Sequence, residues 1–337
     1  MAITVGNAQK RIGLALSGGG FRAAAFHLGV FRQLQTQGLL WKLDLLTCVS
    51  GGSIAGAFLC RNWGNDAALD RLEQYLRSAS IAVSSVLGGM LDPFHTRLDK
   101  LADSYDRDLF AGCTLDALAG GPRLYLNATN LATGNLFSFV TGGGKPTEMG
   151  EWEMGFHPAE HFRLGRAVAA SSAFPPVFPP LRLDQDAFPA HGADFICLTD
   201  GGVYDNLGIN PLVRDRNALD YVVVSDGGKP FSIVEQPTES SAAVLVEAID
   251  ILMEQVRGLQ FKRLELGMLR ANGPKPVWFS IDSAIGQAQD GDAAFASAIG
   301  TNLKRLSGDE MTVLKRHAGA LLMHRLHTYT PELLRHG

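Results

Sequence analysis

Short apolar runs alternate with helical patterns along most of the chain. Five runs rich in β-forming residues end in turn residues and are followed by apolar residues at helical spacing. These runs are Ile12–Leu16, Leu45–Val49, Leu124–Asn127, Phe195–Leu198 and Tyr221–Ser225. Strands that alternate with helices predict an α/β fold with a parallel or mixed sheet covered on both faces. Because such sheets bind ligands at the carboxyl ends of their strands, the residues that follow each run are the first candidates for chemistry.

The last hundred residues have a mainly helical pattern. Apolar residues recur at three- and four-residue steps over Ser241–Met268, which predicts a long amphipathic helix that packs on the sheet. A second helical segment is expected over Asp292–His324, after a strand-like run at Val277–Ile281. We therefore expect a main domain at residues 10–235 and a mainly helical C-terminal extension at residues 236–337, packed on the same core.

Composition limits the partners and the compartment. Lys and Arg number 30 against 34 Asp and Glu, a formal net charge of -4, and no run of five like charges occurs. Nucleic acid is therefore not an expected partner, because its recognition needs a basic face. The four cysteines, Cys48, Cys60, Cys113 and Cys197, lie far apart and form no C-x-x-C pair. Free thiols and a reducing compartment are expected.

The sequence has little to suggest export or a membrane span. Lys10 and Arg11 precede only a short apolar stretch, which Arg22 soon follows, and this order is not typical of a signal peptide. No uncharged apolar run reaches the roughly 18 residues of a spanning helix. We expect a cytoplasmic protein that is soluble or lies peripherally on a membrane.

Three consecutive glycines, Gly18, Gly19 and Gly20, separate the first strand from the first helical pattern. Backbone N–H groups in such a loop can point at an anion or at a developing oxyanion. Dinucleotide binding is an alternative, because Ala23 completes a partial G-x-G-x-x-A pattern, but only Asp44 approximates the acidic ribose partner. A plain structural turn is the third interpretation.

A serine follows the second strand, in the run Cys48-Val-Ser50-Gly-Gly52-Ser53. A serine among small residues between a strand and a helix is the layout of a nucleophile elbow, although neither serine completes G-x-S-x-G. Ser50 follows the strand directly, where the apex of the turn is expected, whereas Ser53 stands where a helix cap belongs. Ser50 is the candidate nucleophile and Ser53 the alternative, and a capped glycine turn without chemistry is the remaining interpretation.

Asp200 ends the strand that begins at Phe195, and Gly201 and Gly202 follow it. A carboxylate beside unhindered backbone can approach a second strand-end group and act as a base toward a serine. The run Asp226-Gly-Gly repeats this pattern after the next strand, so the turn by itself is a weak signal.

The glycine loop, the serine elbow and Asp-Gly-Gly, in this order, resemble the patatin-like phospholipases, lipid acyl hydrolases with a Ser-Asp dyad. Residues 127–134 and 170–180 resemble two further segments of that family, so the resemblance covers about residues 12–230. It implies a three-layer α/β/α fold with a mixed, mainly parallel central sheet and a catalytic domain at residues 10–235. It also implies a lipid or other acyl-ester substrate and a reaction without a cofactor.

Carried over residue by residue, the resemblance makes Ser50 the nucleophile and Asp200 the general base. It further makes Gly18, Gly19 and Gly20 the oxyanion loop and Arg22 the residue that closes it, with Gly52, Gly201 and Gly202 in support. Cys48 stands where the family usually has glycine.

Other interpretations concern histidines, metals and a lid. Nine histidines invite a Ser-His-Asp triad, but none stands in a motif, and His27 falls inside a helical pattern where packing or capping is expected. His157 and His161 could share a helix face, but Pro158 interrupts it and no third ligand is near, so no metal site is expected. The apolar stretch 81–94 is either a lid or core. A nucleotide-binding or non-catalytic module on a similar fold is the alternative function.

Overall fold

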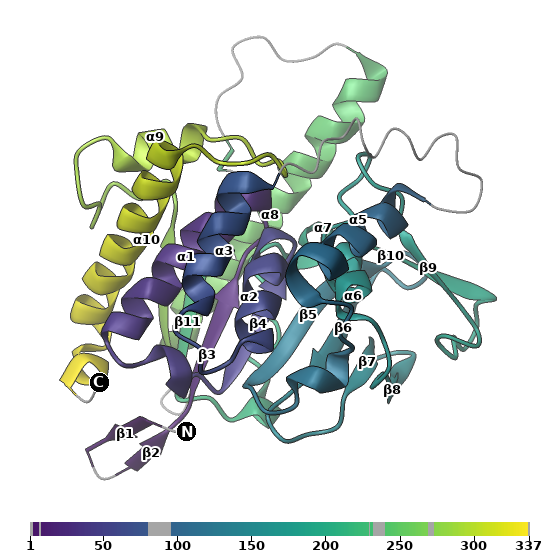
Figure 1. Ribbon diagram of the computed structural model, residues 1–337, viewed down its shortest axis with the longest axis horizontal. Coiled ribbons are helices and arrows are strands. Elements are labelled where there is room, and N and C mark those ends of the chain that lie inside the picture. The colour runs from purple at the N-terminus through teal and green to yellow at the C-terminus, as the bar shows by residue number, and fades with distance from the viewer. Residues whose placement is uncertain are drawn as a thin grey trace.

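A computed structural model of the chain describes residues 3–6, 8–79, 96–228, 230–231, 240–268 and 273–335 (Figure 1). The apolar stretch 81–94, and with it the question of a lid, lies outside the described residues.

The strands are β1 (Ile3–Val5), β2 (Ala8–Lys10), β3 (Ile12–Leu16), β4 (Leu45–Val49), β5 (Arg123–Asn130), β6 (Leu136–Thr141), β7 (Glu148–Glu151), β8 (Gly155–Pro158), β9 (Leu181–Asp184), β10 (Phe195–Asp200), β11 (Tyr221–Asp226) and β12 (Lys275–Ser280). The α-helices are α1 (Gly20–Thr36), α2 (Gly51–Arg61), α3 (Ala68–Ser78), α5 (Arg97–Tyr105), α6 (Leu164–Ser171), α7 (Gly202–Asp205), α8 (Ser241–Met268), α9 (Asp292–Ala298) and α10 (Gly308–Tyr329).

Ten strands form the central sheet, in the order β12-β11-β3-β4-β5-β6-β7-β8, with β10 paired to β5 and to β9. The five strands from β12 to β5 are parallel, and the pairs on the other side of β5 are antiparallel. All six predicted strands are present, β3 and β4 with the predicted bounds. The sheet is mixed as predicted. It has more antiparallel strand pairs than the expected mainly parallel sheet would have.

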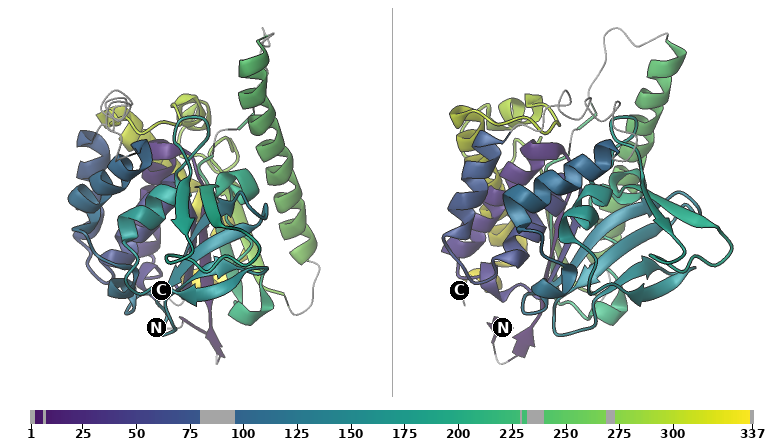
Figure 2. Two further views of the ribbon diagram at one scale, coloured as in Figure 1. Left: turned by 90° about the vertical axis from the view of Figure 1, so that its right-hand side faces the viewer. Right: turned by 45° about the vertical axis from the view of Figure 1, so that its right-hand side comes forward.

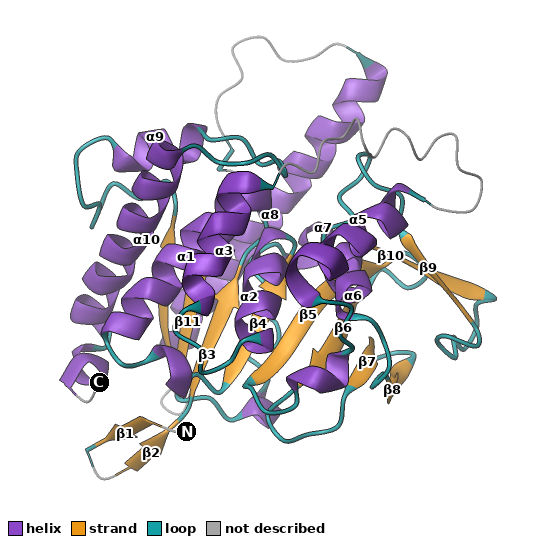
Figure 3. Ribbon diagram, viewed as in Figure 1, coloured by secondary structure: helices purple, strands orange, loops and turns teal. Residues whose placement is uncertain are grey.

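Helices cover both faces of the sheet, which confirms the predicted three-layer α/β/α fold (Figures 1 and 3). Helices α1, α2, α3 and α10 pack together on one face, with α5 and α6 beside them. The left view of Figure 2 shows the long helix α8 on the opposite face, with its N-terminal turns extending beyond the other helices. The two layers leave the carboxyl ends of the parallel strands at one edge, beside the first half of α8.

Alternate residues of each central strand pack into different cores, as the period of two requires. On β3, Leu14 and Leu16 contribute to the large core under α1 and α2, whereas Ala15 contributes to the smaller core on the other face. The smaller core is closed by the second half of α8, through Phe261 and Leu264. The prediction that this helix packs on the sheet is therefore right for its C-terminal half.

An ion pair joins α8 to the sheet at the strand ends. Arg257 Nε donates to Asp226 Oδ2 at 2.7 Å, and its Nη2 donates to Ser280 Oγ at 2.8 Å. The Asp226 carboxylate is fully buried. Burial acts to lower the pKa of Arg257, but the charge of Asp226 and the hydrogen bond to it outweigh this and raise the pKa above its ordinary value. Asp226 is thus committed to a structural contact.

Arg257→Leu is expected to lower the free energy of unfolding by about 3–5 kcal/mol, because Asp226 would remain buried without a partner. Denaturation by urea, followed by circular dichroism, measures the change. Adding Asp226→Asn should recover part of the loss, since the unpaired charge disappears. Arg107→Leu removes an exposed ion pair with Asp108 and should cost less than about 1 kcal/mol. Equal losses in Arg257→Leu and Arg107→Leu would contradict this account.

The predicted second helical segment, Asp292–His324, is not continuous. It forms α9 and α10, separated by residues 299–307, and Ser307 caps α10 in a capping box with Glu310. The carbonyl groups of Ile299 and Asn302 accept hydrogen bonds from Arg22 and from the N–H of Phe21. These tertiary contacts hold the intervening residues in a loop that reaches the strand ends.

Among the described helices, none has the length and apolar character needed to cross a bilayer.

Candidate active site

Ser50 occupies a strained turn between β4 and α2. Its backbone has φ 51° and ψ -116°, a conformation that costs a non-glycine residue energy and is typical of functional turns. A Cβ on Gly51 would lie 2.1 Å from Gly20 O, and one on Gly52 would lie 2.3 Å from Leu16 O. The turn therefore needs both glycines, and Gly51 is a requirement that the sequence analysis did not single out.

Ser171, the last residue of α6, holds the turn in place. Its Oγ accepts a hydrogen bond from Ser50 N–H at 3.0 Å and lies 2.7 Å from Ser53 Oγ. Ser53 is fully buried on α2 and does not line the cavity described below. This geometry favours Ser50 over Ser53 as nucleophile, and it explains why the segment 170–180 accompanies the elbow.

Strand pairing places Asp200 beside the serine turn. Strands β6 and β10 both pair with Ala128 and Thr129 of β5, so they must lie on opposite edges of β5. The edge opposite β6 is the edge on which β4 pairs, up to Val49 against Asn127. Strand β10 continues this edge with Asp200 against Ala128. The ends of β4 and β10 therefore meet head to head, with the serine turn and the aspartate between them.

Burial sets the proton affinity of Asp200. The residue is 2% exposed, and removal from water raises the pKa of its carboxyl to about 7. Hydrogen bonds from Gly202 N–H, at 2.7 Å, and from the Ser50 side chain act in the other direction. A Cβ on Gly201 would lie 2.4 Å from Asn127 O, so this glycine allows the close approach of β10 to β5. Asp200 can therefore be a carboxylate or a neutral acid near neutral pH.

The glycine loop differs from the expectation at one residue. Gly18 N–H donates to Asn206 O at 3.1 Å, so it is already paired. Within the described part of the chain, the N–H groups of Gly19 and Gly20 have no hydrogen-bond partner, and both residues line the cavity. They have φ 139° and 61° and stand at the start of α1, where the helix dipole favours negative charge. Two of the three glycines are thus free to bind an anion.

Arg22 ties this loop to distant parts of the chain. Its fully buried guanidinium donates to Ile299 O at 2.7 Å, to Ser297 O at 3.2 Å and to Gly227 O at 3.1 Å. Burial lowers the pKa of Arg22 to about 10. The side chain lies outside the cavity lining and connects the loop to the C-terminal segment.

Asn206 is a site residue that the sequence analysis missed. Besides its backbone contact with Gly18, its side chain lines the cavity. A methyl group on Gly18 would lie 2.3 Å from Asn206 Oδ1 and 3.1 Å from Ser50 Cβ, and one on Gly202 would lie 2.7 Å from the same Oδ1. The amide is thus between the glycine loop and the end of β10. Asn206 lies six residues after Asp200, and no periodicity in the sequence pointed to it.

The cavity over these residues has a volume of about 470 Å³. This volume is in the range of small-molecule sites. Its lining includes Gly19, Gly20, Ser50 and Asp200, together with the apolar residues Phe174, Val177, Phe178, Pro230, Phe231, Val246, Met253 and Leu303. The charged lining residues are Asp200, Glu247, Asp250, Glu254, Arg257 and Lys304. About half of the lining therefore comes from residues after 230, where the sequence analysis named no site residue.

None of the histidines in the described ranges lines this cavity. His27 is fully buried, with Nδ1 2.9 Å from Ser225 Oγ and Nε2 3.0 Å from Ser17 O. Burial lowers its pKa to about 4. Over the same ranges, no group of three His, Cys, Asp or Glu side chains could hold a metal ion.

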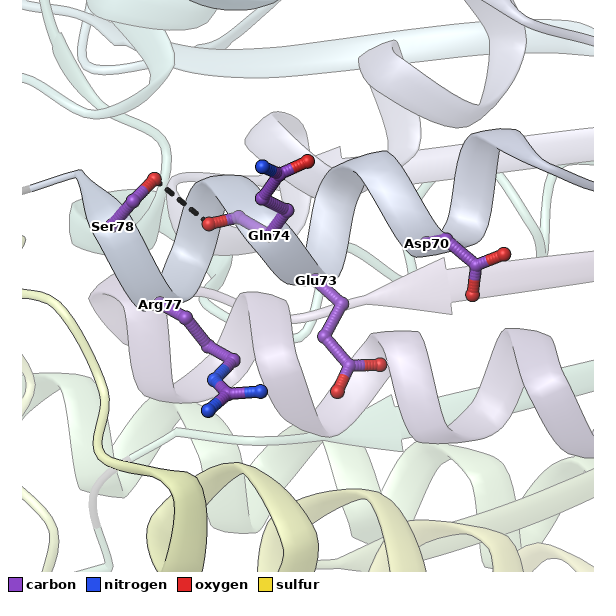
Figure 4. Close-up of a pocket in the computed structure, with 5 residues that line it drawn as sticks. All are labelled: Asp70, Glu73, Gln74, Arg77 and Ser78. Atoms are coloured by element: carbon purple, nitrogen blue, oxygen red, sulfur yellow. Dashed lines mark hydrogen bonds between the residues drawn. The ribbon is translucent and has the colours of Figure 1, made fainter.

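A second hollow of about 510 Å³ lies on the outer surface of α3 (Figure 4). Its lining residues are Asp70, Glu73, Gln74, Arg77 and Ser78, all from one helix. Glu73 pairs with Lys315 of α10 at 2.7 Å, and Ser78 Oγ donates to Gln74 O at 2.8 Å. The residues of this hollow make helix–helix contacts, and none of them is a strained serine. Its larger volume therefore does not make it a better candidate active site than the cavity over Ser50.

Cys48, which stands where the resembling family usually has glycine, is fully buried. A Cβ on Gly56 of α2 would lie 2.3 Å from Cys48 Sγ, so the thiol occupies space that this glycine leaves open. The extra side chain is therefore accommodated below the turn and away from Ser50.

Comparisons with known proteins agree with this geometry. The patatin-like phospholipase family model matches residues 14–213, more than half of the chain. No curated protein matches the chain by sequence. Among solved structures, human GIVD cytosolic phospholipase A2 has a TM-score of 0.61 at 15% identity, covering 97% of this chain and 61% of that chain. The same protein in complex with methyl gamma-linolenyl fluorophosphonate has a TM-score of 0.60 at 16% identity, covering 97% and 59%.

At such low identity the two structures show a shared fold, and the chain spans about three fifths of the length of the phospholipase A2. The family match is independent of them and includes the glycine loop, the serine turn and Asp200. The chain belongs to the patatin-like phospholipase family.

Proposed function

We propose that the protein is a lipid acyl hydrolase in which Ser50 is the nucleophile and Asp200 is the general base. The observation that carries the proposal is the pairing of a strained serine with a buried carboxylate in the lining of one largely apolar cavity. The family, whose members hydrolyse lipid acyl esters, supports the reaction class. A nucleotide-binding role is less well supported, because the glycines with free N–H groups line the same cavity as this serine and Asp200.

The proposed reaction has two halves. Ser50 Oγ bonds to the ester carbonyl carbon while its proton passes to Asp200, and the carbonyl oxygen becomes an oxyanion. The ester C–O bond then breaks, and Asp200 returns the proton to the departing alcohol. Water attacks the acyl-enzyme in the same way: Asp200 takes its proton, the bond to Ser50 breaks, and Ser50 is reprotonated as the fatty acid leaves.

The cavity walls suit an acyl chain. The apolar walls over Ser50 can receive the hydrocarbon, and Val177 and Phe231 are both lining residues and partly exposed to solvent. We therefore propose that Val177 and Phe231 meet a lipid surface when substrate enters.

A fluorophosphonate ester tests the nucleophile directly, because only an activated serine displaces its fluoride. Mass spectrometry of the digested adduct should place the label on Ser50. A lipid mixture incubated with the protein should release free fatty acid together with a lyso or partly deacylated product. A label on another serine, or no label together with no released fatty acid, would overturn the proposal.

The activity should rise with pH through about 7. Only the carboxylate form of Asp200 can accept a proton, and burial raises the pKa of this group to about 7. The pH dependence of kcat/KM measures this value in the free enzyme. A profile that is flat from pH 5 to 9 would contradict the assignment.

The same shift makes an opposite prediction for stability. The folded state binds the Asp200 proton more tightly than the unfolded state does, because the ordinary pKa is 3.8. The stabilising contribution of the Asp200 proton is therefore fully present below about pH 4. It is lost as the pH rises to about 7, so the free energy of unfolding decreases over this range. Comparison of the wild type with Asp200→Asn across this range should reveal the difference, with the variant more stable relative to the wild type at higher pH.

Gly20→Ala is expected to lower kcat by about 10²–10³. The new Cβ would lie 2.5 Å from Asn302 O at a φ of 61°, so the loop must shift and its N–H must turn away from the oxyanion. Gly144→Ala is the matched control, because Gly144 has φ 65° and no atom near its Cβ position. If both variants remain folded and equally active, the loop is only a turn.

A further inference from the structure

Asn206 places a carboxamide in the lining of the cavity that contains Ser50. The side chain is half-buried, and the backbone O of Asn206 accepts a hydrogen bond from Gly18 N–H at 3.1 Å. Among the described residues, none is hydrogen-bonded to the side-chain amide itself. A polar group that is partly withdrawn from bulk water usually has a partner. The amide is therefore available for contact with a reacting molecule.

The turn around Asn206 fixes the direction of this amide. The buried Asp205 carboxylate accepts hydrogen bonds from backbone N–H groups of the same turn and from Asn210 Nδ2 at 2.7 Å. A Cβ on Gly228 would lie 2.9 Å from Asn206 Nδ2 and 2.9 Å from Asp226 Oδ1. The NH₂ group thus lies beside the Asp226 carboxylate, whose charge attracts it. The amide oxygen is the atom left for other contacts.

This amide oxygen lies beside the proposed base. A Cβ on Gly202 would lie 2.7 Å from Asn206 Oδ1 and 3.0 Å from Asp200 Oδ1. These are ordinary lengths of hydrogen bonds between oxygen atoms, so one water molecule can bridge two oxygens with this separation. The same Asn206 Oδ1 and Ser50 Cβ both lie next to the Cβ position of Gly18. The oxygens of Asn206 and Asp200 are therefore both close to the nucleophile.

Two acceptors beside the nucleophile favour a molecule that carries two protons. An amide oxygen accepts hydrogen bonds, and Asp200 acts as a base only as a carboxylate. Water can donate one proton to each of them, whereas an alcohol has a single hydroxyl proton. In the free enzyme the Ser50 hydroxyl donates to Asp200. Once Ser50 is acylated it has no proton to donate, and the carboxylate can accept one from water.

We propose that Asn206 is a catalytic residue of deacylation, in which its Oδ1 holds the water that hydrolyses the acyl-enzyme. This inference rests on the proposed hydrolase function. The water oxygen bonds to the acyl carbon while one water proton passes to Asp200 and the other stays hydrogen-bonded to Asn206. The bond between the acyl carbon and Ser50 Oγ then breaks. Asp200 returns its proton to this oxygen, and the fatty acid leaves.

Asn206→Ala is expected to slow deacylation at least about 10-fold and to leave acylation nearly unchanged, because only the second half of the reaction uses the water. With 4-nitrophenyl octanoate, the variant should release a burst of about one nitrophenol per enzyme. Its kcat and KM should fall by the same factor, so that kcat/KM stays within about 2-fold of the wild type. Mass spectrometry of the quenched variant should find the octanoyl group on Ser50.

Added methanol separates the positioning of water from a general loss of activity. Methanol has one hydroxyl proton, so its attack needs Asp200 and not Asn206. The ratio of methyl octanoate to octanoic acid should therefore rise at least about 10-fold in Asn206→Ala. Asn206→Leu keeps the branched shape of the side chain without the acceptor and should give the same rise. This second variant supplies the test if Asn206→Ala does not fold.

Asn210→Ala is the matched control, because it removes a carboxamide from the same turn. The Asn210 amide binds Asp205 and Arg263 and does not line the cavity. The variant should lose stability, measured by urea denaturation, while its product ratio in methanol stays that of the wild type. A rise in this ratio as large as in Asn206→Ala would show that any disturbance of the turn has the same effect, and would overturn the proposal.

Fluorophosphonate labelling of Ser50 separates this inference from the proposed function. A wild type that is not labelled would remove both. A labelled wild type together with a folded Asn206→Ala that hydrolyses ester as fast would overturn the role of Asn206 alone. So would a variant in which kcat/KM and the rate of labelling fall as much as kcat while the methanol ratio is unchanged, since the amide would then only support the glycine loop.

Discussion

Ser50→Ala is expected to abolish ester hydrolysis, whereas Ser53→Ala should keep most of it. Loss of the nucleophile in a serine hydrolase costs about 10⁶ in kcat. Ser50 lines the cavity on a strained turn and its side chain is hydrogen-bonded to Asp200, whereas the Ser53 hydroxyl is buried against Ser171. Fatty acid release from a lipid or a chromogenic ester measures the difference.

The two serines are a matched pair, because they stand three residues apart and have the same side chain. Ser53→Ala removes one buried hydrogen bond and should lower the free energy of unfolding by about 1 kcal/mol without moving the nucleophile. Circular dichroism at the assay temperature confirms that each variant is folded. If Ser53→Ala is inactive and Ser50→Ala is active, the two roles must be exchanged.

Asp200→Asn should lower kcat by at least about 10²–10⁴, the usual value of a positioned general base. The substitution keeps the shape of the side chain and can keep the contact with Gly202 N–H, but it removes the proton acceptor. No histidine of the described residues lines the cavity, and the Ser50 side chain is hydrogen-bonded to Asp200, so Asp200 is the expected proton acceptor. The kinetics of the variant should also lose the rise through about pH 7.

Asp226→Asn is the control for this substitution, because Asp226 also ends a strand and precedes two glycines. Its carboxylate is held by Arg257, so the variant should lose stability and far less activity. Single replacement of each of the nine histidines should never match the loss in Asp200→Asn among variants that remain folded. One folded histidine variant as inactive as Ser50→Ala would replace the dyad by a Ser-His-Asp triad.

The desolvation of Asp200 links activity to stability. A carboxyl group in water would be ionised at neutral pH but too weak a base to take a serine proton effectively, whereas burial brings its pKa near the working pH. The same burial costs free energy whenever the group is ionised. The site is thus a place where the fold loses stability in order to retain a reactive group.

Local sequence was sufficient to predict the strands and helices that have a clear hydrophobic pattern of their own. The apolar runs of β3 and β4 and the periodic apolar residues of α8 gave the observed bounds, because strand and helix periods depend on neighbours along the chain. The same reasoning failed at residues 299–307, where the helix is interrupted because backbone carbonyls bind Arg22 and Phe21. Contacts between residues almost 300 positions apart leave no trace in a local pattern.

By itself, the sequence determined an α/β fold, the serine turn, the glycine loop and two Asp-Gly-Gly turns at strand ends. The turn pattern alone did not distinguish the two aspartates; the family resemblance selected Asp200, and the tertiary structure supplies the physical difference between them. Strand β10 pairs with the same edge of β5 as β4, just beyond the point where β4 ends, and this brings Asp200 to Ser50, whereas Asp226 is paired with Arg257 of α8. It also decided that Gly18 is already hydrogen-bonded and that residues after 230 close the cavity. The physical reason is that strand pairing, burial and ion pairing depend on residues distant in sequence, which periodicity and motifs do not report.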